Sequence, residues 1–285
     1  MNGKRLLLCP VRRCRLPLTA DEGRLHCPRE HSFDVARSGY VNLLQPQDRR
    51  SARPGDATGT VRARQRLSAR GLEVPITNAI VDLLTLHPAD AVLDVGCGEG
   101  HHLATIAARF GCEGHGLDIS VAAIEAAAKQ RPELRWVVAN ADRFLPYADA
   151  SFRVVASITA QRNPAEFRRV LRDDGTLLLV VPGPDDLIEL RELILGQGLE
   201  RDRVEQAIAA FAPLFVLDRH ERIRHAVHLD ASAIADVMAG SYRAGRASRE
   251  AKLAAVAELD VTLSRDALLF QPSRARRRTR TEEGS

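Results

Sequence analysis

The sequence predicts an α/β fold in which a Rossmann-like parallel sheet follows a small N-terminal metal-binding module. Three observations predict this class. Residues 91–95 form an apolar run that leads into a turn containing Gly96, Gly98 and Gly100. Apolar residues then recur at helical spacing, and further short apolar runs alternate with helical segments, which is the pattern of βαβ units. Three of the five cysteines stand near the start of the chain.

The N-terminal module, residues 1–45, is predicted to bind zinc through Cys9, Cys14, Cys27 and His31. The spacings C-x4-C and C-x3-H suit zinc, which prefers thiolate and imidazole ligands in two close pairs. This stretch is too polar to build a core, so the metal would supply its folding energy. In an alternative interpretation the cysteines are incidental and buried. His26 is a rival fourth ligand, although its adjacency to Cys27 makes joint ligation awkward.

A basic linker is expected over residues 46–74, with a helix from about residue 60. One interpretation of its arginines is contact with a nucleic-acid backbone, and the alternative is a solvated helix face. The arginines are Arg49, Arg50, Arg53, Arg62, Arg64, Arg66 and Arg70.

The large domain is expected over residues 75–272. A helix at 75–86 should lead into parallel strands at 91–95, 114–117, 135–138, 153–157 and 176–181. A long helical region is predicted at 185–212, and a closing antiparallel pair at 215–229 and 261–270. The arginine-rich tail, residues 273–285, is expected to be disordered.

The glycine turn and the acids around it predict a nucleotide-type ligand. Gly96, Gly98 and Gly100 allow close approach of the backbone, and Asp118, at the tip of the second strand, suits the two hydroxyls of a ribose. These features fit NAD as well as S-adenosylmethionine (SAM). Asp94 favours SAM, because an anion beside the turn would oppose a pyrophosphate but would attract an ammonium or a sulfonium.

Several motifs together resemble the Rossmann-like SAM-dependent methyltransferases. They are Asp94-x-Gly96-x-Gly98-x-Gly100, Asp118, Ala141-Asp142 with Leu145-Pro146, and the turn at 171–177. The resemblance places Asp94 near the methionine ammonium, Asp118 at the ribose and residues 140–142 at the adenine edge. The expected cofactor-binding set is Asp94, Gly96, Gly98, Glu99, Gly100, His101, Asp118, Asn140, Ala141, Asp142 and Asp186.

A narrower resemblance rests on the run from His31 to Leu44, H-x-F-D-x-A-x-x-G-Y-V-N-L-L, and on the later Pro54-Gly55-Asp56. With the zinc-ribbon or zinc-knuckle domain and the SAM domain, these segments resemble the bacterial 23S rRNA guanine-N1 methyltransferases. The resemblance implies SAM and Zn²⁺ as cofactors, 23S rRNA as partner, methyl transfer to N1 of a guanine in a stem-loop, and a homodimer.

The chain also departs from the family pattern. Arg12-Arg13 lengthen the first cysteine pair, and residues 158–161 read Ile-Thr-Ala-Gln where the family has an Ala-Pro pair. Glu73 stands where some members offer an aromatic residue to the cofactor.

The reaction implied by this resemblance needs a group that removes the guanine N1 proton before or during methyl transfer. Asp142 and Asp186 are candidates, but the sequence assigns neither, and the catalytic residue stays unknown. His101 or His102 would contact the methionine end or would simply begin a helix.

Composition limits the remaining possibilities. The chain has 285 residues and a formal net charge of +4, and it contains no apolar run long enough for a membrane span. Its N-terminal apolar stretch is too short for a signal peptide, so a cytoplasmic location is expected. Two rival functions remain at this stage: methylation of a small molecule, and a non-enzymatic role in RNA binding or ribosome assembly.

Overall fold

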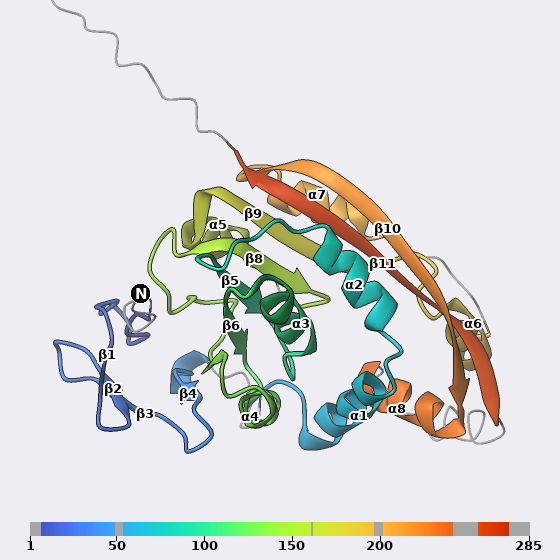
Figure 1. The fold of residues 1–285 in the computed structure, drawn as a ribbon, viewed down its shortest axis with the longest axis horizontal. Coiled ribbons are helices and arrows are strands. Elements are labelled where there is room, and N and C mark those ends of the chain that lie inside the picture. Colours follow the sequence, from blue (N-terminus) through green and yellow to red (C-terminus); the bar gives the residue numbers. More distant parts are fainter. Residues whose placement is uncertain (1–6, 49–53, 161, 197–201, 242–255, 274–285) are drawn as a thin grey trace, which may run out of the picture.

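The computed structural model describes residues 7–48, 54–160, 162–196, 202–241 and 256–273. In this part of the chain eight strands form one twisted sheet in the order β10-β11-β9-β8-β5-β6-β7-β4 (Figure 1). Its five central strands are β5 (Ala91–Val95), β6 (Glu113–Asp118), β7 (Arg135–Val138), β8 (Phe152–Ile158) and β9 (Leu171–Pro182). They pair in parallel, as predicted.

Both faces of this parallel part of the sheet are covered. Val92, Leu93 and Val155 are fully buried, which is typical of strands that lie between two helical layers. From β5 the chain moves outward through β6 and β7, then returns to β8 on the other side of β5. This reversal of strand order opens a crevice at the carboxyl ends of β5 and β8, where ligands bind in open α/β sheets.

The helices that flank the sheet follow the predicted alternation. They are α2 (Val74–Asp82), α3 (His101–Phe110), α4 (Val121–Gln130) and α5 (Pro164–Val170). The glycine turn leads directly into α3, and Gly111 ends that helix in the left-handed region with φ of 63°. The prediction for the helix at 75–86 was too long, because α2 ends at Asp82.

The far end of the sheet is the predicted antiparallel pair. β10 (Phe215–Asp230) and β11 (Glu258–Pro272) pair along their length, and β11 also pairs antiparallel with β9. Between them the chain forms α8 (Ala231–Ser241).

The prediction of one long helical region at 185–212 was wrong in its continuity. α6 (Ile188–Leu195) stops at Gly196, whose φ of 69° allows a left-handed cap. A separate helix, α7 (Val204–Phe211), follows.

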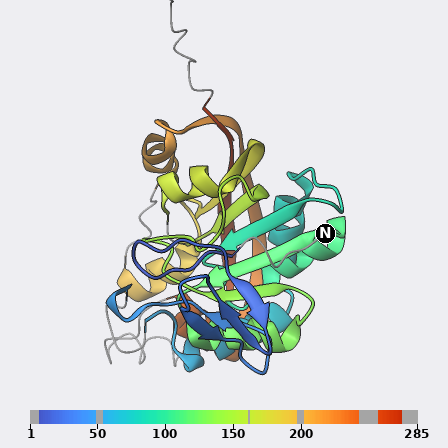
Figure 2. The same ribbon diagram turned by 90° about the vertical axis from the view of Figure 1, so that its left-hand side faces the viewer.

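The N-terminal module is a small sheet joined to the edge of the large one. β1 (Thr19–Asp21), β2 (Arg24–His26) and β3 (Ser32–Asp34) pair antiparallel, and the two-residue β4 (Val41–Asn42) pairs in parallel with β7. The 3-10 helix η2 (Pro46–Asp48) follows. Figure 2 shows this module, in blue, in front of the sheet edge. Its buried side chains belong to the same apolar cluster as the core of the large domain.

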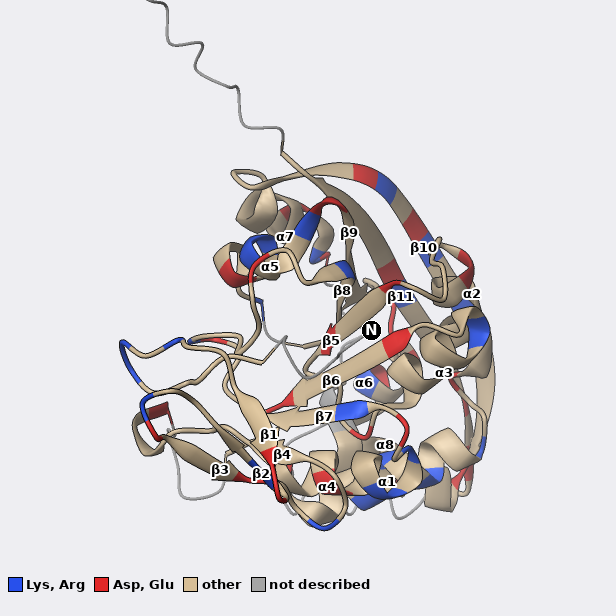
Figure 3. Cartoon of the chain, turned by 60° about the vertical axis from the view of Figure 1, so that its left-hand side comes forward, with Lys and Arg blue, Asp and Glu red and all other residues tan. Residues whose placement is uncertain are grey.

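The predicted basic linker contains α1 (Thr58–Ala69), which packs against α8 rather than standing free. Arg66 pairs with Asp236 and Arg70 with Asp230, at 2.5 and 2.9 Å. Figure 3 shows α1, with several Lys or Arg positions in blue, beside α8. For these two arginines the structure favours a structural role over contact with a nucleic acid.

Some predictions fall on residues that the structure does not describe. Arg49, Arg50 and Arg53 of the linker lie outside the described residues, as does the tail from residue 274. Among the helices that are described, none combines the length and the apolar character needed to cross a bilayer.

Candidate active site and metal centre

The glycine turn has a backbone that other residues would not adopt easily. Gly96, Gly98 and Gly100 have φ angles of 78°, 56° and 82°. A Cβ on Gly100 would lie 2.2 Å from the ring of Trp136, which is buried beneath the turn. Trp136 is therefore part of the apolar core beneath the turn. At Gly100 the Trp136 ring leaves no room for a side chain, whereas Gly96 and Gly98 line a cavity above the turn.

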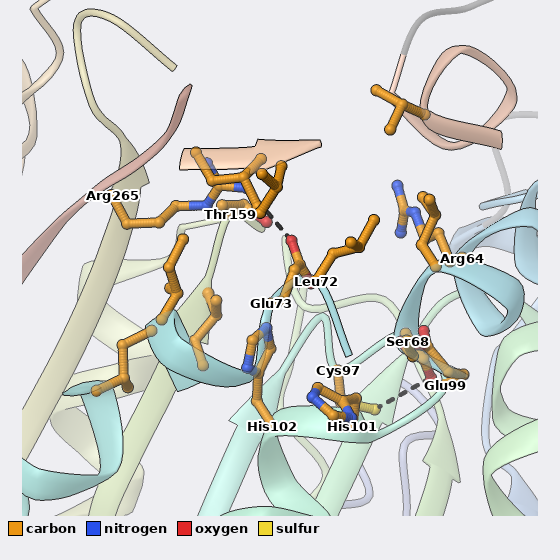
Figure 4. A pocket seen from close by; sticks show the side chains of 18 of the residues that line it. Arg64, Ser68, Leu72, Glu73, Cys97, Glu99, His101, His102, Thr159 and Arg265 are labelled. Atoms are coloured by element: carbon orange, nitrogen blue, oxygen red, sulfur yellow. Dashed lines mark hydrogen bonds and ion pairs between the residues drawn. The ribbon is translucent and has the colours of Figure 1, made fainter. Parts of the chain in front are cut away.

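A cavity opens above this turn (Figure 4). Its walls come from α1, α2, the start of α3 and the strands β10 and β11. Five residues of the predicted cofactor set are in its lining: Asp94, Gly96, Gly98, Glu99 and His101. The structure adds residues from distant segments, chiefly Arg64, Ser68, Glu73, His102 and Arg265.

Asp94 is the most buried acid of the cavity, with 2% of its surface exposed. Burial raises its pKa to about 7, and the negative charges of Asp118 and Glu99 add to this effect. A carboxyl group in such a place costs free energy when it ionises, and a cationic ligand group would offset that cost. This environment suits the ammonium of SAM.

Asp118 ties the glycine turn to the end of β6. Its Oδ2 accepts the N–H of Gly98 at 3.0 Å, and its Oδ1 accepts the N–H of Ser120 at 2.8 Å. Burial raises the pKa of Asp118 more than these two N–H groups lower it. Both oxygens keep lone pairs for further donors, so a ribose would be bound by a carboxylate that is already fixed in place.

Residues 140–142 form a turn at the end of β7 and do not line the cavity. The Asn140 side-chain oxygen accepts the N–H of Asp142 at 3.0 Å, and its amide donates to the backbone oxygen of Asp48 at 2.8 Å. The hydroxyl of Ser120 donates to the backbone oxygen of Asp56 at 2.8 Å. The described parts of the segment from Asp48 to Asp56 thus lie against the strand ends expected to face adenosine.

Sequence reasoning missed that α1 reaches the cavity. The hydroxyl of Ser68 donates to Glu99 at 2.9 Å, so α1 contacts the glycine turn itself. Arg64 pairs with Asp56 at 2.8 Å and donates to the backbone oxygen of Gly240 at 2.9 Å. The only signal in the sequence was the density of arginine in a helical segment, which does not identify partners.

A second charged group lies on the opposite wall of the cavity. Nη2 of Arg265 lies 3.4 Å from Oε1 of Glu73, and Nη1 pairs with Asp186. Asp186 also accepts the N–H of Ser264 at 3.0 Å and does not itself line the cavity. Asp186 thus pairs with Arg265 in this structure, and its place in the cofactor-binding set stays a prediction.

His102 stands between Glu73 and the glycine turn (Figure 4). Its Nδ1 lies 3.1 Å from the hydroxyl of Thr77. Burial lowers the pKa of His102 to about 4, so the imidazole is neutral at pH 7.

The predicted zinc ligands come together as expected. The ligand atoms of Cys9, Cys14, Cys27 and His31 all lie within 4.8 Å of one another. Nδ1 of His31 is 3.3 Å from the Cys27 sulfur and 3.5 Å from the Cys9 sulfur. Three thiols and one imidazole that meet at a point fit tetrahedral Zn²⁺, whereas His26 lies outside this group.

The local backbone prepares the cysteines for a metal. Burial raises the pKa of Cys27, but N–H groups of Arg29 and His31 outweigh it and lower the pKa to about 6. The thiolate is the form that binds zinc. The two extra residues between Cys9 and Cys14 are accommodated by Arg13, whose φ of 66° is left-handed.

Two family models match the parts of the chain that form the cofactor cavity and the metal cluster. A family model described as a methyltransferase domain matches residues 92–175, and a zinc-ribbon model described as RlmA, N-terminal, matches residues 7–52. The glycine turn, the acids around it and the Cys3His cluster therefore define a SAM-dependent methyltransferase with an N-terminal zinc ribbon.

Individual relatives narrow the class. The 23S rRNA (guanine(748)-N(1))-methyltransferase of Streptomyces fradiae is 38% identical, over 84% of this chain and 85% of that protein. A Bacillus subtilis (strain 168) protein, YxjB, provisionally assigned as a 23S rRNA (guanine-N(1)-)-methyltransferase, is 36% identical over 79% of this chain and 82% of that protein. The chain belongs to the family of 23S rRNA (guanine-N1)-methyltransferases.

A solved structure supports the fold alone. A chain from the complex between the Haloferax volcanii Trm112 methyltransferase activator and a methyltransferase superposes with a TM-score of 0.51 at 18% identity. It covers 75% of this chain and 95% of that one.

Proposed function

We propose that this enzyme transfers the methyl group of SAM to N1 of a guanine in 23S rRNA. The observation that carries the proposal is the similarity to the Streptomyces fradiae enzyme, which spans 84% of this chain. A relationship restricted to the methyltransferase domain would favour the small-molecule alternative equally well.

The roles of the cofactor residues follow from the site. SAM supplies a methyl group that its sulfonium already activates, so the protein chiefly has to bind and orient the reactants. Asp94 would hold the ammonium, Asp118 the ribose hydroxyls, and the turn from Gly96 to Gly100 would let the backbone approach the ligand closely.

The ribbon would hold the RNA. Several of its arginines are exposed, and cations of this kind bind phosphates. They include Arg12, Arg13, Arg24, Arg29 and Arg37. Because β4 pairs with β7, an RNA held by the ribbon would be fixed relative to the cofactor cavity.

Labelled SAM and 23S rRNA that lacks the modification test the proposal. The expected result is incorporation of label into one guanine, identified as N1-methylguanosine by mass spectrometry of the nucleosides. An enzyme that binds S-adenosylhomocysteine but leaves the RNA unlabelled would contradict it, and labelling of a small molecule instead would support the alternative.

Two further expectations depend on the same proposal. The homodimer implied by the family resemblance is a prediction, which light scattering coupled to size-exclusion chromatography would test. A ribosomal substrate would place the protein in the cytoplasm.

A further inference from the structure

We propose that Glu73 is the group that accepts the N1 proton of the target guanine, and that Arg265 and Asp186 position it. This inference rests on the proposed function, and it assigns the catalytic residue that the sequence left unknown.

Glu73 occupies a place that both reactants can reach. It is the N-cap residue of α2, and its side chain lines the same cavity as Asp94 and the glycine turn. In Figure 4 its carboxylate points into the cavity, between Arg265 and His102. Its side chain is 37% exposed, so the carboxylate is reachable from outside as well as adjacent to the cofactor site.

The other acids near the cavity already have different roles. Asp94 lies below the glycine turn with 2% exposure, and Glu99 accepts the hydroxyl of Ser68. Asp118 accepts two backbone N–H groups, and Asp186 accepts the N–H of Ser264 and pairs with Arg265.

Glu73, by contrast, has an oxygen to spare. Within the described part of the chain, its Oε1 is held 3.4 Å from Arg265, while its Oε2 has no hydrogen-bond donor. A carboxylate fixed through one oxygen presents the other to a substrate.

Arg265 can hold the Glu73 carboxylate in place because its own guanidinium is held by other contacts. Only 12% of its side chain is exposed, and Nη1 donates to the backbone oxygen of Ser264 at 2.9 Å in addition to pairing with Asp186. The carboxylate of Asp186 balances the charge of the guanidinium, which leaves Nη2 directed at Glu73. A chain of charged contacts thus runs from Asp186 through Arg265 to Glu73, which lines the cavity.

The chemistry of guanine matches a carboxylate at this point. Its N1–H and its 2-amino group are neighbouring donors on one edge, and the two oxygens of a carboxylate accept such a pair. The N1–H bond breaks, the proton moves to Glu73, and the electron pair stays on N1. N1 then forms a bond to the methyl carbon, while the carbon–sulfur bond breaks and its electrons return to sulfur as S-adenosylhomocysteine. Glu73 finally releases the proton to water.

The groups around Glu73 favour its ionised form, which is the form that can accept a proton. Burial raises the pKa of Glu73, but its electrostatic interactions with two imidazoles and two guanidinium groups outweigh burial and lower the pKa. These groups come from three elements: His102 and His101 of α3, Arg265 of β11, and Arg64 of α1.

Glu73→Gln tests the assignment, since glutamine has the same shape but cannot take up the proton. We expect single-turnover methylation of 23S rRNA to slow by about 10²–10⁴-fold, the usual contribution of a positioned acid or base, with unchanged affinity for S-adenosylhomocysteine. Glu125→Gln, on the exposed face of α4 where it pairs with Lys129, is the matched control and should keep the wild-type rate.

The pH profile separates a proton acceptor from a structural group. At alkaline pH hydroxide removes the N1 proton without a protein group. The methylation rate of Glu73→Gln should therefore rise toward the wild-type rate. A structural defect would slow the reaction by the same factor at every pH, and that result would overturn the inference. Asp186→Asn should give a smaller loss of rate, with the same alkaline recovery.

Failure of the inference and failure of the proposed function look different. If the wild type methylates N1 of guanine and Glu73→Gln does so equally fast, only the role of Glu73 is refuted. If the wild type methylates no guanine, the proposed function itself fails.

Discussion

The zinc ribbon and the cofactor end of the sheet are held together by different means. In the ribbon, β1 to β3 are three residues long and few side chains are fully buried, so three thiols and an imidazole organise it. At the cofactor end, β5 and β8 are buried throughout their centres, and the glycine turn rests on Trp136. One region therefore depends on a metal, and the other on packing.

The two regions should therefore tolerate different kinds of substitution. The ribbon should respond strongly to loss of one ligand and weakly to most other changes, because the metal supplies its folding energy. The cofactor end should respond to changes of volume and of buried charge.

Cys27→Ser should unfold the ribbon. Structural zinc binding is worth roughly 10–16 kcal/mol in small zinc domains, so loss of one ligand removes most of the folding energy of residues 7–45. Zinc content, measured by mass spectrometry of the metal, should fall, whereas affinity for S-adenosylhomocysteine should be nearly unchanged. His26→Ala is the control, because His26 lies outside the metal cluster and should leave the zinc content intact. Full zinc content in Cys27→Ser would contradict the ligand assignment.

Gly100→Ala should damage the cofactor end while leaving zinc in place. The new Cβ would lie 2.2 Å from the Trp136 ring on a backbone with φ of 82°. Overpacking and a left-handed conformation together predict a loss of roughly 2–5 kcal/mol in the free energy of unfolding. Gly59→Ala, where a Cβ meets no atom within 4 Å, is the matched control for denaturant titrations. An equally stable Gly100→Ala would show that the turn is not fixed by Trp136.

Asp94→Asn tests whether the buried Asp94 carboxylate binds the ammonium of SAM. A hydrogen bond to a charged group is worth about 1.5–3 kcal/mol, which predicts about 10- to 100-fold weaker binding of SAM by calorimetry. Asp82→Asn, at the exposed end of α2, should bind as the wild type does.

The same residue predicts the direction of the pH dependence. The pKa of Asp94 is about 7 in the folded protein against an ordinary value of 3.8, so the neutral form is favoured by folding without ligand. Its contribution to stability is full below its ordinary pKa and is lost as the pH rises through 7. A cationic ligand needs the ionised form, so SAM affinity should increase from about pH 6 to about pH 8 with release of protons. A flat profile, or the same profile in Asp94→Asn, would place the ammonium elsewhere.

The metal site and the glycine turn could be predicted from the sequence, because their residues lie close together along the chain. The metal ligands lie within 22 positions of one another, and Asp94 stands two residues before the first glycine of the turn. Five parallel strands and the antiparallel pair were also found, because their apolar runs are short and regular.

The sequence missed contacts between distant segments. Arg265 lies 192 positions from Glu73, and Asp236 lies 170 positions from Arg66. Arginine and aspartate occur throughout this chain, so no local pattern distinguishes those that meet across the fold. Asp186 is an example, because nothing near it in the sequence indicates that it pairs with Arg265.

Arg12→Gln should give the smallest effect. Arg12 is exposed in the turn between Cys9 and Cys14, and loss of one phosphate contact should weaken RNA binding slightly. The slope of binding against salt should fall by roughly 0.7–0.9, while zinc content and SAM affinity stay unchanged. Arg109→Gln, on α3, is the control and should bind RNA as the wild type does. An unchanged salt slope in Arg12→Gln would remove Arg12 from the RNA-binding surface.

Mass spectrometry of nuclease fragments can compare 23S rRNA from cells with and without the gene for this protein. We expect one guanine to carry a methyl group on N1 only when the gene is present. Identical fragments in both strains, from cells shown to contain the folded and zinc-loaded protein, would contradict it.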